Sequence, residues 1–236
     1  MGSGFLLGFG ENGWGPLLLH GAVMTMAVAL TGFGIGLLIG TTGAWAKLKG
    51  GYLSRGLADA YTTILRGIPD LLVIYLFYFG SSAVLTPLGG LFGASGFISL
   101  PGFLAGSLAI GLVSGAYQTE VMRGAYRAVS SGEIEAAIAS GMSQLTLFRR
   151  IVAPLVLRHA LPGLGNVWQL VLKESALVSV TGLVEILRTA QIGAGSTGQP
   201  FTFFLAAAVL YLVISSISGW LLRRTEWRLT RGTRPV

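Results

Sequence analysis

The segment that decides the fold is Pro16–Ala46, PLLLHGAVMTMAVALTGFGIGLLIGTTGAWA, which contains no charged residue. About 20 consecutive apolar residues are enough for a helix to cross the hydrocarbon core of a bilayer. Four further stretches meet this length, although charges and Pro or Gly interrupt two of them: 57–85, 102–121, 161–183 and 201–222. We therefore predict an all-α integral membrane protein with about five transmembrane helices, forming a single domain over residues 1–236.

The composition agrees with a membrane environment. Only 11% of the 236 residues are charged, whereas soluble domains carry about 25%, so the surface must face lipid. The chain has no Cys and two His, which excludes disulfides and thiolate metal sites and makes a histidine metal site unexpected. Residues 1–13 contain no Lys or Arg ahead of the apolar residues, so we predict no cleavable signal peptide.

Lys and Arg gather on one side of the predicted spans. Most of the 16 basic residues follow the first, third and fifth spans, and the loop 86–101 contains no charge. Cytoplasmic loops carry an excess of Lys and Arg, so we predict an external N-terminus and a cytoplasmic C-terminus. The net charge of +7 then reflects topology, and no basic stripe with interleaved aromatic residues suggests nucleic acid.

Glycine recurs at four-residue spacing within two spans, at Gly32, Gly36 and Gly40 and again at Gly111 and Gly115. Such small-residue faces let helix backbones approach closely in lipid. The pattern suits packing within this chain or an interface with another subunit, and both interpretations remain open.

A polar, patterned segment separates the third and fourth spans. Ser130 with Glu133 is typical of a capping box, and Gly141 suits a left-handed helix end. Ser143 can begin a second helix that Pro154 limits. These signals predict two short helices joined at Gly141, either as an interfacial helix pair or as a docking surface for a cytoplasmic partner.

The residues of this segment resemble the EAA loop of bacterial ABC import permeases. The resemblance rests on spacing that matches throughout, with Ala153 where the family usually has Leu, and it is carried by Glu135, Ala136, Ala137, Gly141, Ile151 and Pro154. It implies that residues 130–158 form a coupling segment, with Glu133, Glu135 and Gly141 at the contact with an ATP-binding subunit. ATP and Mg would then lie on a partner dimer of ATP-binding cassette subunits, with no cofactor on this chain, which lacks a P-loop sequence.

Three further phrases look like the polar amino-acid branch of that family, which includes histidine/lysine/arginine/ornithine, octopine and nopaline permeases. They are Arg66–Pro69, Gly115–Glu120 and Leu161–Asn166. The resemblance implies transport of a polar, cationic amino acid or an opine across a bacterial inner membrane. It also implies a second permease half, either a copy or a related chain, and an extracytoplasmic solute-binding protein.

Charges inside the second span require an explanation, because a charge at mid-bilayer costs at least about 3 kcal/mol. Arg66 and Asp70 are four residues apart, and Pro69 between them should break or kink the helix. Interrupted segments of this kind bind solute in transporters. The two residues either form a pair that locks the kink or contact solute directly.

The remaining charged candidates lie in or near spans three and four. Glu120 pairs with a basic residue such as Arg123, or it recognises a cationic solute together with the ring of Tyr117. Lys173 and Glu174 cannot both face lipid, and Gln169 could share their polar face. The candidates for the solute pathway are therefore Arg66, Asp70, Tyr117, Glu120, Gln169, Lys173 and Glu174.

The next pair along the chain, Glu185 and Arg188, is expected to be solvated on the outer loop. Two other classes of function compete with transport. A channel or structural subunit without ATP coupling would explain the glycine faces but not the EAA spacing. A membrane-embedded enzyme would need convergent His, Asp and Glu residues, which are sparse and scattered within the spans.

Overall fold

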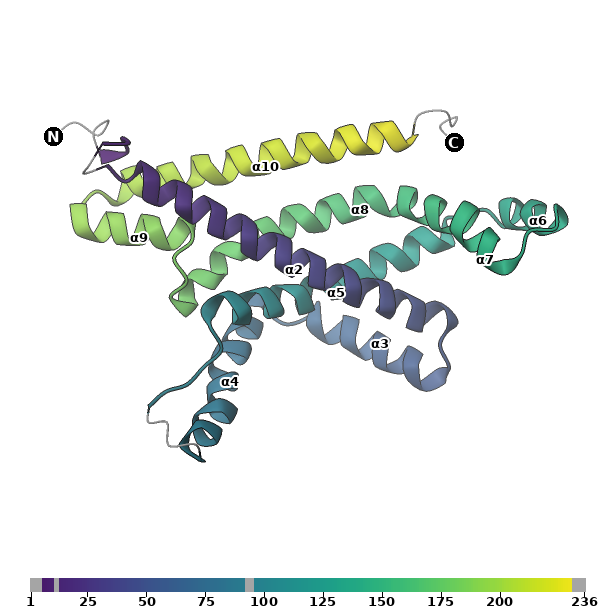
Figure 1. Cartoon of the computed structure of the whole chain (residues 1–236), viewed down its shortest axis with the longest axis horizontal. Helices are drawn as coiled ribbons and strands as arrows, with labels where there is room; N and C mark the ends of the chain where they lie inside the picture. Colours follow the sequence, from purple (N-terminus) through teal and green to yellow (C-terminus); the bar gives the residue numbers. More distant parts are fainter. Residues whose placement is uncertain (1–5, 11–12, 92–95, 231–236) are drawn as a thin grey trace.

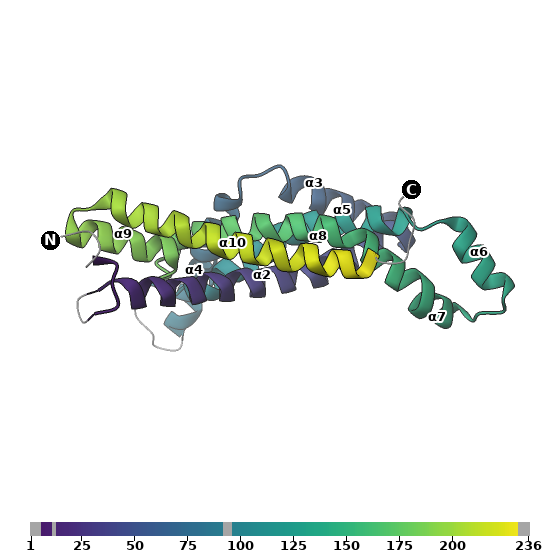
Figure 2. The same ribbon diagram turned by 90° about the horizontal axis from the view of Figure 1, so that it is seen from above.

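The computed structural model describes residues 6–10, 13–91 and 96–230, and the regular secondary structure within these ranges is helical throughout. Four long helices form an elongated bundle (Figures 1 and 2). They are α2 (Gly15–Lys49), α5 (Gly102–Arg127), α8 (Ala153–Glu174) and α10 (Pro200–Thr230). The all-helical class predicted from the sequence is therefore confirmed for the described residues.

Among the described residues, three helices are long and apolar enough to cross a bilayer: α2, the first 19 residues of α4 (Asp70–Leu91), and nearly all of α10. At 1.5 Å per residue, α5 and α8 are about 40 Å and about 33 Å long, which also exceeds the hydrocarbon thickness. Both are more polar, and α5 buries Gln118 and Thr119 inside the bundle. Their membrane crossing, and hence the count of five spans, stays a prediction.

The glycine faces pack α2 directly against α5. An added Cβ at Gly36 would lie 2.3 Å from Ser114 Oγ, and one at Gly32 would lie 2.8 Å from a methyl carbon of Ile110. From the other side, a Cβ at Gly111 would lie 2.6 Å from Ile35. Side chains at these positions would force the two helices apart. The intramolecular interpretation of the glycine spacing is therefore confirmed.

The apolar core lies where α2, α4, α5 and α8 meet. Its buried side chains include Val28, Val73, Ile74, Ile110, Val113, Trp168, Val171 and Leu172. Large apolar side chains also cover the outside of the bundle: Val23, Leu38 and Leu212 are each about two-thirds or more exposed. An apolar outer face with polar groups inside is the arrangement that lipid favours.

The chain interrupts its helices at two places. The predicted span 57–85 divides into α3 (Tyr52–Leu65) and α4, with the break at residues 66–69, and α4 diverges from the bundle (Figure 1). Pro69 causes this break, as predicted, because its ring disfavours helical backbone at Ile68. The second interruption follows Glu174, where α8 tightens into the 3₁₀ helix η2 (Ser175–Thr181).

The helix pair between α5 and α8 consists of α6 (Ser131–Ala139) and α7 (Gln144–Leu147). Gly141 has φ of +80°, as predicted. Its amide donates to Ile138 O at 2.9 Å, and the next amide, of Met142, donates to Ala137 O at 3.3 Å. These two bonds form a Schellman motif, which requires the left-handed conformation that glycine adopts without strain.

Two details of the predicted helix pair are wrong. Ser130 is the N-cap residue of α6, but its side chain makes no capping hydrogen bond, so the predicted capping box does not form. Pro154 does not limit the second helix, because α7 continues through the π-helix η1 (Phe148–Val152) into α8. A π-turn pairs a carbonyl with the amide five residues on, and here the amide of Ala153 donates to Phe148 O. Pro154 follows in the first turn of α8, where a proline is tolerated.

The connections gather at the two ends of the bundle (Figure 1). The C-terminal ends of α2 and α10 lie at the same end as α6 and α7, and α9 (Ile186–Thr197) lies at the opposite end. The basic loops singled out in the sequence therefore lie at one end of the molecule. We call this end, which includes α6 and α7, the basic end.

Candidate functional site

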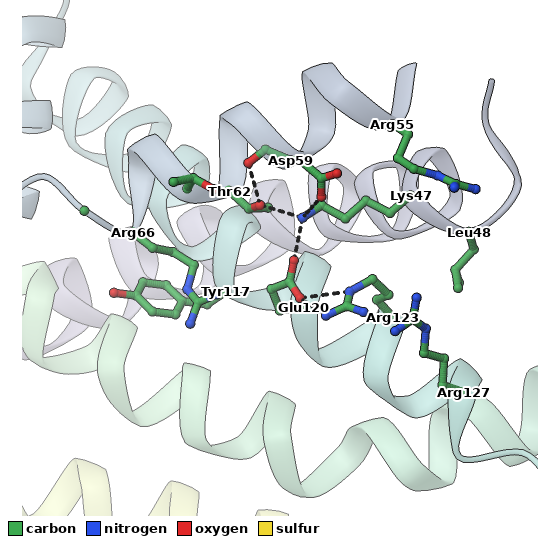
Figure 3. Close-up of a pocket in the computed structure, with 12 residues that line it drawn as sticks. Lys47, Leu48, Arg55, Asp59, Thr62, Arg66, Tyr117, Glu120, Arg123 and Arg127 are labelled. Atoms are coloured by element: carbon green, nitrogen blue, oxygen red, sulfur yellow. Dashed lines mark hydrogen bonds and ion pairs between the residues drawn. The ribbon is translucent and has the colours of Figure 1, made fainter. Parts of the chain in front are cut away.

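A cavity of about 680 Å³ opens between the C-terminal part of α2, helix α3 and helix α5 (Figure 3). We call it the basic cavity, because five cationic side chains contribute to its wall. Its lining consists of Lys47, Leu48, Arg55, Asp59, Thr62, Thr63, Arg66, Gly67, Tyr117, Glu120, Arg123 and Arg127.

Lys47 forms ion pairs and a hydrogen bond with residues from two other helices in the wall of this cavity. Its ammonium lies 2.6 Å from Glu120 Oε1, 2.8 Å from Asp59 Oδ1 and 2.6 Å from Thr62 Oγ1. Lys47 is only 8% exposed, and a buried cation needs such partners to offset its lost hydration. The contacts join α2, α3 and α5 through one side chain.

This role was not predicted from the sequence, where Lys47 counted only among the basic residues that follow the first span. The available signal was Asp59, a single carboxylate within an amphipathic helix and close in sequence to the apolar segment. A lone acid at such a position needs a cationic partner nearby. The sequence does not show which of several nearby basic residues contacts Asp59.

Of the two roles that the sequence left open for Glu120, the structure shows the ion pair. Glu120 accepts a hydrogen bond from Arg123 Nε at 2.9 Å in addition to its bond with Lys47. Its side chain also lines the basic cavity (Figure 3). Glu120 is therefore an ion-paired residue in the wall of a cavity, and both of its nearest cations come from this chain.

Arg66 lies over the ring of Tyr117, with 5.3 Å between the guanidinium carbon and the ring centroid. This is a cation–π contact, in which the ring face attracts the cation. Arg66 and Asp70 both belong to the described residues, and no ion pair joins them there. The kink is therefore not locked by an Arg66–Asp70 pair.

Glu174 is buried, and neither of its carboxylate oxygens has a hydrogen-bond partner among the described residues. The polar side chain that lies close to it is another acid, Asp70. Tyr117 interacts electrostatically with both acids and with Arg66. The two helix interruptions thus bring together four predicted residues, which we call the inner polar cluster: Arg66, Asp70, Tyr117 and Glu174.

A buried carboxylate without a donor is costly unless a cation or proton satisfies it. In the inner polar cluster, Glu174 and Asp70 provide two acids and Arg66 provides one base. The arrangement is therefore suited to accept positive charge from a ligand, while Arg66 can pair with a carboxylate.

The structure does not bring Gln169 or Lys173 to this cluster. Gln169 donates to Ser215 O at 3.2 Å and accepts from the Ser215 hydroxyl, so it joins α8 to α10. Lys173 is exposed on the outside of α8, whereas its neighbour Glu174 points into the bundle. The prediction that the two adjacent charges cannot both face lipid is confirmed.

Glu185 is fully buried, so the prediction that it is solvated is wrong. It caps α9 by accepting from the amides of Leu187 at 2.9 Å and Arg188 at 2.7 Å. The hydroxyl of Tyr211 donates to the same carboxylate at 2.9 Å, and Thr25 contributes a longer bond. Burial raises the pKa of Glu185, although these donors oppose the shift.

Comparison with known proteins explains this architecture. Residues 32–231 match the family of binding-protein-dependent transport system inner membrane components. The octopine transport system permease protein OccQ of Rhizobium radiobacter is 60% identical, with 96% of each chain covered. The histidine/lysine/arginine/ornithine transport system permease protein HisQ of Escherichia coli is 38% identical, covering 94% of this chain and 97% of HisQ.

Solved structures of ABC transporters contain chains with a similar fold. A crystal structure of an amino acid ABC transporter with histidines contains a chain with a TM-score of 0.78 and 32% identity, covering 91% of this chain and 95% of that one. A chain of the MetNI methionine ABC transporter in an inward-facing conformation has a TM-score of 0.72 at 17% identity, covering 94% of this chain and all of that one, which shows a shared fold. The chain belongs to the family of binding-protein-dependent transport system inner membrane components. It is a multi-pass membrane permease subunit and not itself an enzyme.

Proposed function

We propose that this chain is the permease subunit of an ATP-driven importer that carries a cationic amino acid or an opine across the bacterial inner membrane. The relatives that support this substrate class are named as permeases for octopine, nopaline and histidine/lysine/arginine/ornithine. ATP and Mg would be bound by a dimer of ATP-binding cassette subunits, and a second permease half would complete the pathway. An extracytoplasmic solute-binding protein would deliver the solute.

The observation that carries the solute class is the lack of a donor to Glu174 beside Asp70. A bound cation would let both acids of the inner polar cluster ionise, and together with the protonated Arg66 they would then give the cluster a net charge of −1. A cationic amino acid has a net charge of +1, so it would neutralise the cluster. Its carboxylate would pair with Arg66, and its ammonium and cationic side chain would pair with the two acids. Such pairing is strong where water is excluded.

The interrupted backbone supports the same location. Arg66 and Asp70 flank the break between α3 and α4, and Glu174 ends α8 where η2 begins. Backbone that leaves the helix inside a membrane is tolerated where protein or a polar cavity satisfies it. Transporters bind solute and coupling ions at such breaks.

The coupling role belongs to residues 130–158. Two acids of α6, Glu133 and Glu135, are exposed. Three large apolar side chains of the segment are also more than half exposed: Ile138 on α6, Leu145 on α7 and Phe148 at the start of η1. Exposed apolar side chains next to acids are suited to a protein partner. We assign the ATPase contact to Glu133, Glu135, Ala136 and Gly141.

Three members of the EAA pattern act inside the coupling segment. Ala137 is buried with Leu147 and Val152, and Ile151 packs against this small core. Pro154 lies in the first turn of α8, just after the π-turn. These residues keep the helix pair rigid, so that a displacement imposed by the ATPase would reach α5 and α8.

We further propose five spans, formed by α2, α4, α5, α8 with η2, and α10. The basic end would face the cytoplasm and α9 the exterior. This orientation follows the bias of Lys and Arg toward cytoplasmic loops. It would put α6 and α7 on the side where ATP is available.

The test is uptake by the complete complex in proteoliposomes, with its binding protein outside and ATP inside. Arginine, histidine and octopine should each compete for uptake of a labelled member of this set, and glutamate should not. Glu174→Gln should lower uptake at least about tenfold, because losing one charge-assisted bond to the solute costs about 1.5–3 kcal/mol.

Lys173→Gln is the matched control, since Lys173 is the adjacent residue and points away from the cluster. It should keep uptake within about twofold of the unaltered complex. Uptake that continues without ATP would indicate a channel and contradict the proposed function. Normal uptake by Glu174→Gln would contradict the solute site alone.

A further inference from the structure

The charges around the basic cavity do not balance. Its wall contains five cationic side chains and two carboxylates, those of Asp59 and Glu120. The described lining therefore has a net charge of +3, or +2 when Arg66 is counted with the inner polar cluster. Low-dielectric walls focus such a charge and concentrate anions near it.

The excess charge can be assigned to particular residues. Lys47 and Arg123 are neutralised by Asp59 and Glu120. Arg55 and Arg127 also line the cavity and are exposed, and no ion pair to either is formed within the described ranges. In Figure 3, Arg55 and Arg127 are both drawn on the side of the cavity away from Arg66 and Tyr117.

The basic cavity adjoins the inner polar cluster, because Arg66 and Tyr117 belong to both. The cluster holds the acids that attract a cation, and the cavity beyond it holds cations that attract an anion. A solute moving from the cluster toward the basic end therefore passes from negative to positive surroundings.

We propose that Arg55 and Arg127 form a carboxylate-binding subsite on the exit side of the solute site, and that the chain favours guanidinium solutes with a second carboxylate. This proposal rests on the proposed function. A planar guanidinium binds a carboxylate through two parallel hydrogen bonds, which distinguishes it from a simple point charge. The subsite holds the additional carboxylate as the guanidinium of the solute leaves Asp70 and Glu174.

The first test measures the local field without requiring transport. The chain contains no Cys, so Thr63→Cys places a single thiol in this chain at the cavity wall, where Thr63 is exposed. The complete complex in nanodiscs is treated with anionic or cationic methanethiosulfonate reagents, and modification of this chain is followed by mass. We expect the anionic reagent to gain at least about tenfold in relative rate over a free thiol.

The matched comparison adds Arg55→Gln and Arg127→Gln to the same Thr63→Cys chain. This change should remove most of the preference for the anionic reagent. Arg228→Gln, an exposed substitution on α10, should leave the preference intact. An unchanged preference in the Arg55/Arg127 double variant would overturn the assignment of the field to these residues.

The second test identifies the ligand with three probes that share a guanidinium: agmatine, arginine and octopine, which have no, one and two carboxylates. Protection of the Thr63→Cys thiol from modification should increase in that order. The Arg55/Arg127 double variant should lose about tenfold in octopine affinity, while its arginine affinity should change less than about twofold. Equal losses for arginine and octopine would overturn the proposal. Since neither test requires ATP-driven uptake, a failure of that uptake would contradict the proposed function without affecting them.

A lipid phosphate is the other source of an anion at this end of the molecule, because basic pockets between membrane helices bind acidic headgroups. The nanodiscs are therefore prepared with phosphatidylcholine alone and with phosphatidylglycerol added. If octopine protection is equal in both, the solute carboxylate is the ligand. If phosphatidylglycerol protects the thiol and octopine does not, the proposal is overturned in favour of a lipid site.

Discussion

Glu174 and Glu185 are buried carboxylates eleven positions apart, but they differ in their hydrogen-bond donors. This difference indicates a functional role for Glu174 and a structural role for Glu185. Glu185 accepts hydrogen bonds from two backbone amides and two hydroxyl groups. Glu174 has no donor among the described residues and lies near a second acid. The hydrogen bonds of Glu185 are satisfied within the fold, whereas an unsatisfied carboxylate is suited to bind a ligand.

Glu185 makes the stability of the chain depend on pH. Burial raises its pKa in the folded chain above the ordinary value of 4.5, so the folded state binds a proton more tightly than the unfolded state. Stability should therefore fall as the pH rises from about 4.5 through the folded-state pKa. Between pH 5 and pH 8, the thermal midpoint of the solubilised chain should fall further than that of Glu185→Gln, by about 3 °C.

The control for this prediction is Glu133→Gln, because Glu133 is exposed on α6. Its midpoint should follow the same pH dependence as the unaltered chain. If Glu185→Gln also retains that dependence, other groups cause it and the role assigned to Glu185 is wrong.

At the scale of elements, α2 and α5 depend on the absence of side chains at their contact. An added methyl group at Gly36 would lie 2.3 Å from Ser114 Oγ and 2.7 Å from Gln118 Nε2. We expect Gly36→Ala to lower the free energy of unfolding by about 2 kcal/mol, because overpacked interfaces must shift backbone or rotamers. Thermal unfolding in detergent, followed by size-exclusion fluorescence, measures this change.

Gly34 gives the matched control within the same helix. It is exposed, and an added Cβ there would meet nothing within 4 Å. Gly34→Ala should leave stability unchanged or raise it by about 0.5–1 kcal/mol through its higher helix propensity. Equal destabilisation by both substitutions would show that the α2–α5 contact is not responsible.

The coupling segment depends on a single left-handed residue. At Gly141, with φ of +80°, a β-branched side chain strains the backbone by about 1–2 kcal/mol or more. Gly141→Val should distort the turn between α6 and α7, so that ATP hydrolysis continues while solute uptake per ATP falls several-fold. The ratio of uptake to phosphate release in proteoliposomes measures this uncoupling.

Gly132→Val is the corresponding control. Gly132 lies in α6, where a Cβ would meet only Ser130 Oγ, at 3.6 Å. Its ratio of uptake to phosphate release should stay close to that of the unaltered complex. A normal ratio in Gly141→Val would remove the support for a coupling role of this turn.

At the scale of the whole molecule, the two ends of the bundle differ in charge. The basic end includes the ends of α2, α5 and α10 together with α6 and α7, and the opposite end includes α9 (Figure 1). An excess of Lys and Arg holds a segment on the cytoplasmic side during insertion. The proposed orientation of the molecule therefore rests on which connections carry the charge.

The absence of Cys allows this orientation to be measured. Ser196→Cys lies in α9 and Ser130→Cys precedes α6, and both positions are exposed. In intact spheroplasts, a membrane-impermeant maleimide should label Ser196→Cys and should label Ser130→Cys only after lysis. The reverse pattern would contradict the proposed orientation.

The sequence by itself determined the membrane class, the position of the helix break and the pair of short helices joined at Gly141. Long apolar runs, Pro69 and a glycine between two short helices are local signals, because their effects act on a few neighbouring residues. The resemblance at Glu135–Pro154 likewise depends on spacing along the chain. These features could be predicted because they do not depend on which distant helices pack together.

Only the tertiary structure decided the partners of the charged residues. The sequence could not show that Lys47 contacts Asp59 and Glu120, that Glu185 is buried by Tyr211, or that Gln169 faces α10. Several bonding partners are available to each group, and the packing of helices selects among them. The net charges of the inner polar cluster and the basic cavity arise in the same way, because residues from three or four helices create each of them.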